Sequence, residues 1–142
     1  MWPFKDYEKI SRSVSTDELR VALYGFEPDD IDLRDRDYQS IPVDDFLALA
    51  WKYGNGHPVW IAEKMDCDNI TVCFMADVYR GWNKVYGKSR ALAFGYIDAI
   101  IPGSASPHAF IWHYHNGKIT FIEPQTYEVI YKRPRKVRLV EG

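Results

Sequence analysis

The residue types that could carry chemistry gather around Cys67, which stands between Asp66 and Asp68 in the segment EKMDCDNITVCFMADVYRGW. A thiol is a weak nucleophile until it ionises, and a helix N-terminus and a neighbouring imidazolium both favour the thiolate. A carboxylate behind the imidazole fixes the tautomer of the ring. Downstream of Cys67 the chain supplies both groups, as His108 and Glu123. The pattern predicts a thiol nucleophile with an imidazole base and an orienting carboxylate.

The same segment allows other interpretations of the cysteine. Asp66 and Asp68 place negative charge next to the sulfur and oppose its ionisation. One of them is a candidate helix cap, and both together are candidate ligands of a calcium ion. Cys67 by itself also fits a small apolar residue in a buried helix stripe, as free cysteine usually is. Cys73 has no place in the first helical turn and is predicted to be a core residue.

A helix is predicted to position the thiol. Asp66 is a good N-cap, so Cys67 becomes the first helical residue, and Gly81 is the predicted end. Apolar positions at helical spacing form one stripe: Cys67, Ile70, Phe74 and Val78. The thiol therefore heads the buried face of this helix.

A β-hairpin is predicted to position the imidazole and the carboxylate. Asn116-Gly117, between two runs of alternating residues, predicts a two-residue type I′ turn. This turn sets His115 opposite Lys118, Trp112 opposite Phe121, Phe110 opposite Glu123, and His108 opposite Gln125. The face that carries His108, Phe110, Trp112 and Tyr114 is too apolar for water and is predicted to pack on the helices. At its end His108 and Glu123 are diagonal neighbours, within reach of each other.

The remaining elements give a fold class. Ser15 and Glu18 form a capping box before a helix that Gly25 ends, and a second helix is predicted over 43–53. The acidic stretch 26–40 is predicted to be a loop, and strands follow beyond residue 90. Helices first and strands second predict an α+β fold, with a helical N-terminal half packed on an antiparallel β-sheet. Residues 1–142 fit a single domain.

Composition narrows the function classes. The chain is 46% hydrophobic and 15% aromatic, so it can bury a substantial core. The two cysteines, six residues apart in one helix, cannot form a disulfide with each other, and the N-terminus lacks the apolar run of a signal peptide. We therefore expect a cytoplasmic protein in a reducing compartment, and no stretch is long and apolar enough to cross a membrane. The basic C-terminal tail, 132–142, is predicted to be a solvated end on an edge strand, which makes nucleic-acid binding the weaker interpretation.

Several of these segments together resemble a known superfamily. DCDN at a helix start, HAFIWHYHNGKITFIEPQ with a histidine at a strand start, and an acid before proline resemble the papain-like and transglutaminase-like cysteine hydrolases. The closest branch is the bacterial transglutaminase-like cysteine peptidases, and the resemblance covers about residues 60–126. It implies a papain-like or transglutaminase-like architecture, with Cys67 as nucleophile, His108 as general base and Glu123 as orienting acid. The superfamily usually has Asp at the third position.

The resemblance also implies a ligand set. In the branch named, acids that flank the cysteine bind calcium, so Asp66 and Asp68 are candidate ligands, although no cofactor is required. Trp60, from its position upstream of the cysteine, and Gln125 are candidates for oxyanion or substrate contacts.

His113 and His115 share a strand face, as two metal ligands would, but no third ligand has matching spacing.

The function predicted from the sequence is acyl transfer through a Cys-His-Glu triad. The protein would be a hydrolase or acyltransferase of the peptidase or amidase type, acting on a peptide, protein or other amide-containing substrate through a thioester. Two alternatives belong to other classes. One is a catalytically inactive binding or scaffold module of the same fold, because fold does not determine function. The other, weaker one is a nucleic-acid-binding protein that uses the basic tail. The sequence leaves open whether the chain is an enzyme.

Overall fold

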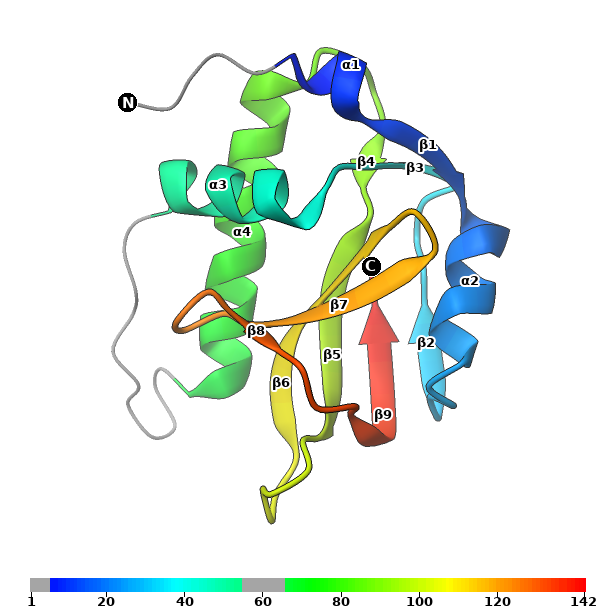
Figure 1. The fold of residues 1–142 in the computed structure, drawn as a ribbon, viewed down its shortest axis with the longest axis vertical. Helices are drawn as coiled ribbons and strands as arrows, with labels where there is room; N and C mark the ends of the chain where they lie inside the picture. The colour runs from blue at the N-terminus through cyan, green and yellow to red at the C-terminus, as the bar shows by residue number, and fades with distance from the viewer. Residues whose placement is uncertain (1–5, 55–65) are drawn as a thin grey trace.

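The computed structural model describes residues 6–54 and 66–142 (Figure 1). The helices are α1 (Tyr7–Ile10), α2 (Thr16–Tyr24), α3 (Val43–Tyr53) and α4 (Cys67–Val85). The strands are β1 (Arg12–Ser15), β2 (Asp30–Asp32), β3 (Asp37–Ser40), β4 (Ala91–Leu92), β5 (Phe94–Ile100), β6 (His108–His115), β7 (Lys118–Glu123), β8 (Glu128–Ile130) and β9 (Arg135–Glu141).

The strands form two sheets. The larger sheet has the strand order β2-β9-β5-β6-β7-β8, and its neighbours are antiparallel except for β2 and β9, which are parallel. The smaller sheet has the order β1-β3-β4, with β3 and β4 parallel. In Figure 1, α3 and α4 lie to one side of the larger sheet and α2 lies to the other.

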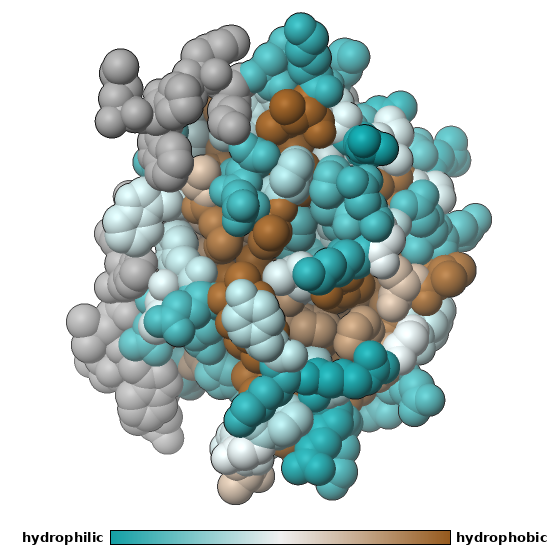
Figure 2. Space-filling view, viewed as in Figure 1, coloured by the Kyte–Doolittle hydropathy of each residue, from teal (hydrophilic) through white to brown (hydrophobic). Residues whose placement is uncertain are grey.

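Both faces of the larger sheet are covered, so its central strand β6 is buried on both sides. On one face Phe110 and Trp112 belong to a hydrophobic cluster that contains Leu19 and Leu23 of α2. On the other face Ile111 belongs to a second cluster, which is built with residues of α3 and α4. In the space-filling view, hydrophobic residues gather near the centre of one face and hydrophilic residues surround them (Figure 2).

The predicted helix starts are confirmed where a local signal marks them. The Ser15 side chain accepts a hydrogen bond from the backbone N–H of Glu18 at 3.1 Å, and α2 ends before Gly25. Helix α3 spans the predicted 43–53, and α4 begins at Cys67.

The end of α4 differs from the prediction. The helix continues through Gly81 to Val85, because Gly81 packs against another side chain instead of ending the helix. A Cβ at Gly81 would lie 2.6 Å from the ring of Tyr53, so the missing side chain lets α3 approach α4 closely.

The hairpin register is confirmed over the paired residues. Trp112 lies opposite Phe121 and His115 opposite Lys118. Asn116 and Gly117 have φ angles of 49° and 78°, the positive values that a type I′ turn requires.

The predicted architecture is wrong. The N-terminal half is not a helical layer on an antiparallel sheet, because β1, β2 and β3 alternate with its helices and two strand pairs are parallel. The stretch 26–40, predicted to be a loop, supplies both β2 and β3. Strand β2 has three residues, Asp-Ile-Asp, and exists through its pairing with β9 at the other end of the chain. No local sequence pattern predicts such a strand, because the strand with which it pairs is distant in sequence.

The face of β6 that carries Phe110 and Trp112 packs on a helix, as predicted, but that helix is α2, and the helix that begins at Cys67 covers the opposite face. A further prediction is wrong. The basic C-terminal segment is not an edge strand, because β9 lies between β2 and β5. Lys132 and Arg133 donate hydrogen bonds to the carbonyls of Pro102 and Gly25. None of the described helices is long and apolar enough to cross a membrane.

Candidate functional site

The first turn of α4 holds the predicted nucleophile. Asp66 is the N-cap, in a capping box in which the Asn69 side chain accepts from the Asp66 backbone N–H at 3.4 Å. Cys67 is half-buried and Cys73 is exposed, and both are free thiols. The prediction that Cys73 is a core residue is therefore wrong. The buried face of α4 includes Ile70, Thr71 and Phe74, and Cys73 lies on the exposed face of the helix.

The hairpin brings the predicted base and acid together. The Nε2 atom of His108 lies 2.7 Å from Oε2 of Glu123, and both side chains are about a quarter to a third exposed, at 31% and 24%. The backbone N–H of Gln125 donates to the other Glu123 oxygen at 3.2 Å, which orients the carboxylate. With its Nε2 proton donated to Glu123, a neutral His108 presents an unprotonated Nδ1, which can accept a proton.

A buried threonine ties the first turn of α4 to the strand that carries His108. The Thr71 hydroxyl lies 2.6 Å from the Cys67 carbonyl oxygen and 3.1 Å from the carbonyl oxygen of Ala109. Thr71 is fully buried, so its single hydroxyl proton is shared between these two acceptors. The residue after His108 and the cysteine that begins α4 are thus joined through one side chain.

The two aspartates beside the cysteine interact with each other. A hydrogen bond between their side chains raises the pKa of Asp66 and lowers the pKa of Asp68. The Oδ1 atom of Asp66 is buried and has no hydrogen-bond partner among the described residues. Within the described part of the chain, no group of three or more His, Cys, Asp or Glu side chains is arranged to hold a metal ion. Trp60 lies outside the described residues.

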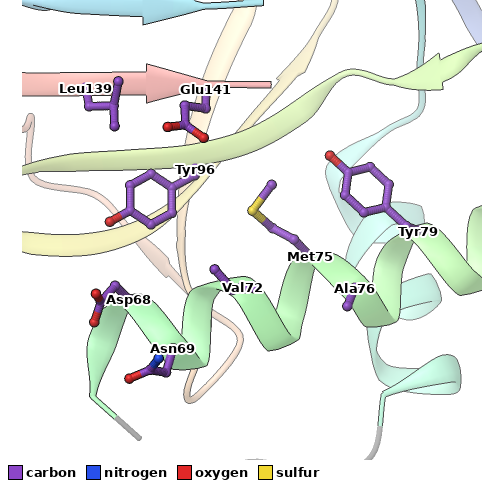
Figure 3. A pocket seen from close by; sticks show the side chains of 9 residues that line it. All are labelled: Asp68, Asn69, Val72, Met75, Ala76, Tyr79, Tyr96, Leu139 and Glu141. Atoms are coloured by element: carbon purple, nitrogen blue, oxygen red, sulfur yellow. The ribbon is translucent and has the colours of Figure 1, made fainter. Parts of the chain in front are cut away.

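A cavity of about 510 Å³ opens beside the same helix end, between α4 and the strands β5 and β9. Its α4 side is formed by Asp68, Asn69, Val72, Met75, Ala76 and Tyr79. Tyr96 of β5 faces them, together with Leu139 and Glu141 of β9. Figure 3 shows Met75 reaching from α4 toward β5 and Tyr96 reaching from β5 toward α4. We call this cavity the α4 pocket.

The α4 pocket combines an apolar floor with aromatic and acidic side chains. Two of its apolar residues are well exposed, Val72 at 57% and Tyr79 at 44%. Burial raises the pKa of Tyr96 to about 12, and the negative charges of Asp98 and Asp68 act in the same direction. A ligand that packs against the rings and hydrogen-bonds to the acids would suit this lining.

Sequence reasoning missed most of this pocket. Tyr96 and Leu139 lie on strands that meet α4 only in the folded chain, and neither belongs to a motif. The sequence signal for a binding surface here was the pair Val72 and Tyr79. These two large hydrophobic residues lie two turns apart on α4, outside its buried stripe.

The predicted histidine pair has another explanation. Nε2 of His113 donates to the backbone carbonyl of Ile41 at 2.8 Å, and the ring is buried. His115 Nδ1 lies 2.8 Å from the Ser40 hydroxyl. Each histidine therefore links β6 to the segment before α3, and burial lowers the pKa of His113 to about 4.

Comparisons with known proteins identify the fold. No protein-family model matches the sequence, and no curated protein matches it. Among solved structures, PSL1a in complex with E64 superimposes with a TM-score of 0.78 and 21% identity, covering 92% of this chain and 51% of that chain. Polyporus squamosus lectin, bound to the human-type influenza-binding epitope Neu5Aca2-6Galb1-4GlcNAc, has a TM-score of 0.71 and 20% identity, covering 92% and 49%. The chain spans about half the length of these structures.

These comparisons correct the predicted identity. Two solved structures that share this fold are PSL1a and Polyporus squamosus lectin, which contradicts the predicted papain-like or transglutaminase-like architecture and the hydrolase or acyltransferase activity inferred from it. The predicted peptide, protein or amide substrate is contradicted as well, because the ligand named for the lectin is a glycan. The motifs misled because a cysteine at a helix start and a histidine at a strand start are short patterns, and any helix packed on a hairpin can contain them.

Proposed function

We propose that this chain is a binding module that takes a saccharide in the α4 pocket. The observation that carries the proposal is the lining of that pocket, which includes the rings of Tyr79 and Tyr96 and the carboxylates of Asp68 and Glu141. The C–H face of a sugar ring packs against aromatic rings, and its hydroxyls donate to carboxylate and amide oxygens. The volume of about 510 Å³ is in the range of small-molecule sites. The shared fold with a lectin supports the same ligand class.

The ring of Tyr96 is expected to supply much of the binding. Tyr96→Ala should weaken saccharide binding about tenfold, since an aromatic contact contributes on the order of 1 kcal/mol beyond its buried area. Tyr96→Phe, which keeps the ring, should bind nearly as well as the wild type. Isothermal titration calorimetry with Galb1-4GlcNAc measures both.

The matched control is Tyr131→Ala. Tyr131 is 91% exposed and does not line the pocket, so its loss should leave binding unchanged. Equal binding by Tyr96→Ala and the wild type would place the ligand elsewhere and contradict the proposal.

A second function is favoured by the hydrogen bond between His108 and Glu123 beside the Cys67 turn. We propose that Cys67, His108 and Glu123 form a reactive thiol site at the edge of the binding module. Cys67 is its nucleophile, Nδ1 of His108 accepts the thiol proton, and Glu123 holds the imidazole through Nε2. Gln125 supports the carboxylate through its backbone N–H. The proposal concerns the reactivity of the thiol toward electrophiles.

Labelling tests the thiol site. With limiting iodoacetamide at pH 6, Cys67 should be alkylated several-fold faster than Cys73, although Cys73 is the more exposed thiol. The sulfur displaces iodide from the reagent and its proton passes to His108. Mass spectrometry of the digested protein locates the adduct, and E64, whose epoxide alkylates thiolates, serves as a second probe.

His108→Ala should abolish the faster alkylation of Cys67 relative to Cys73. His115→Ala should leave this rate difference unchanged, because His115 lies at the other end of β6. Faster labelling of Cys73 than of Cys67 in the wild type would show that the thiol is not activated.

Calcium binding by Asp66 and Asp68 also stays a proposal. The buried, unpartnered Oδ1 of Asp66 supports it, and the remaining oxygens of a calcium site would come from water and backbone carbonyls. Repeating the labelling with calcium added or chelated tests whether the cation changes the Cys67 rate. A cytoplasmic location is likewise a proposal, which the two free cysteines support.

A further inference from the structure

We propose that the α4 pocket selects uncharged saccharides and rejects acidic ones, including the sialylated glycan that the lectin of the same fold binds. This inference rests on the proposed saccharide-binding function and adds the class of ligand to it. It follows from the charges that line and surround the pocket.

The charged residues that line the pocket are both acids. Asp68 comes from the first turn of α4, and Glu141 comes from the end of β9 on the facing side (Figure 3). No lysine or arginine is among the described residues that form the pocket wall. A carboxylate that entered would meet like charge from both sides and would find no cation to pair with.

A third acid, Asp98, lies close to the pocket on β5. The carboxylate of Asp98 acts on Tyr96, and its Oδ1 is buried without a hydrogen-bond partner among the described residues. Negative charge therefore extends along both the α4 wall and the β5 wall.

Two arginines that neighbour the pocket strands are paired with acids. Arg138 of β9 lies 3.8 Å from Asp98, so these two charges partly compensate each other, and Nε of Arg34 donates to Asp32 at 3.1 Å. Because each arginine has a carboxylate partner, neither offers an uncompensated positive charge to an acidic sugar.

The same acids act on the phenol of Tyr96. Burial raises the pKa of its phenol to about 12, and Asp98, Asp68 and Glu141 all act in the same direction. A negative potential that opposes the phenolate at this position also opposes the carboxylate of sialic acid.

A matched pair of glycans tests the inference. Binding of Galb1-4GlcNAc and of Neu5Aca2-6Galb1-4GlcNAc is measured by calorimetry at low and at high salt. We expect the uncharged disaccharide to bind at least about tenfold more tightly at low salt, and we expect the difference to shrink as salt screens the carboxylates.

Neutral variants make the test specific. Asp68→Asn and Glu141→Gln keep the size of the side chains. Each should strengthen binding of the sialylated glycan and so reduce the preference for the uncharged disaccharide several-fold. Glu128→Gln is the control, because Glu128 is an exposed acid on β8, at the far edge of the sheet from β9. It should leave the preference unchanged.

The outcomes separate the two proposals. If the sialylated glycan binds as tightly as the neutral one or more tightly, the inference is overturned while saccharide binding stands. If the preference for the neutral glycan persists in both pocket variants, its cause is not the pocket charge, and the inference is again overturned. If neither glycan binds, the proposed function itself fails and the inference fails with it.

Discussion

Gly95→Ala is expected to destabilise the protein by about 3 kcal/mol, at the upper end of the cost of overpacking a well-packed core. A Cβ at Gly95 would lie 1.9 Å from the carbonyl oxygen of Glu141 in β9. The obstructing atom belongs to the backbone of the neighbouring strand, so rotation of a side chain cannot relieve the contact. The strands β5 and β9 would have to separate, and urea unfolding followed by circular dichroism measures the loss.

The same substitution should also weaken saccharide binding, because β9 carries Leu139 and Glu141 into the α4 pocket. Gly87→Ala is the control. A Cβ there meets only the end of the Glu8 side chain, at 3.1 Å, which can move aside. Its effect on the free energy of unfolding should stay within about 0.5 kcal/mol. A Gly95→Ala variant as stable as Gly87→Ala would show that β9 does not lie against β5 as described.

Acid should destabilise the protein through His113. The ring is buried and neutral, and burial lowers its pKa from 6.5 to about 4. The unfolded chain therefore binds a proton below about pH 6.5 that the folded chain binds only near pH 4. The stability contributed by the neutral ring is fully present above pH 6.5, falls as the pH decreases, and is lost by about pH 4. A pKa difference of this size corresponds to about 3 kcal/mol.

Comparison with His113→Gln isolates this contribution. Glutamine can still donate to the Ile41 carbonyl but does not titrate between pH 4 and 7. Urea unfolding at several pH values should show a steeper loss of stability for the wild type than for the variant. Because all other titratable groups, His115 included, are present in both proteins, the difference between the two curves belongs mainly to His113. Parallel curves would mean that His113 is charged, or solvated, in the folded state.

The sequence by itself determined the elements whose signals are local. The capping box at Ser15 and the N-cap at Asp66 set the starts of α2 and α4, because a cap satisfies backbone N–H groups within one turn. Asn116-Gly117 set the hairpin register for the same kind of reason, since only residues that tolerate positive φ make its turn. That register was enough to predict that His108 and Glu123 meet, and they lie 2.7 Å apart.

The tertiary structure alone decided which elements meet across the sheet. Strand β6 is apolar on both faces, so the alternation of its side chains does not predict which helix covers which face. In the structure α2 covers Phe110 and α4 covers Ile111. The strands β2 and β9 pair residues from the first and the last quarter of the chain. Strand β2 has too few apolar residues to be predicted from its own sequence. The α4 pocket likewise depends on contacts between distant segments, because its walls come from α4, β5 and β9. Contacts of this kind are stabilised by burial between distant segments, and the free energy of that burial leaves no pattern in the sequence of either segment.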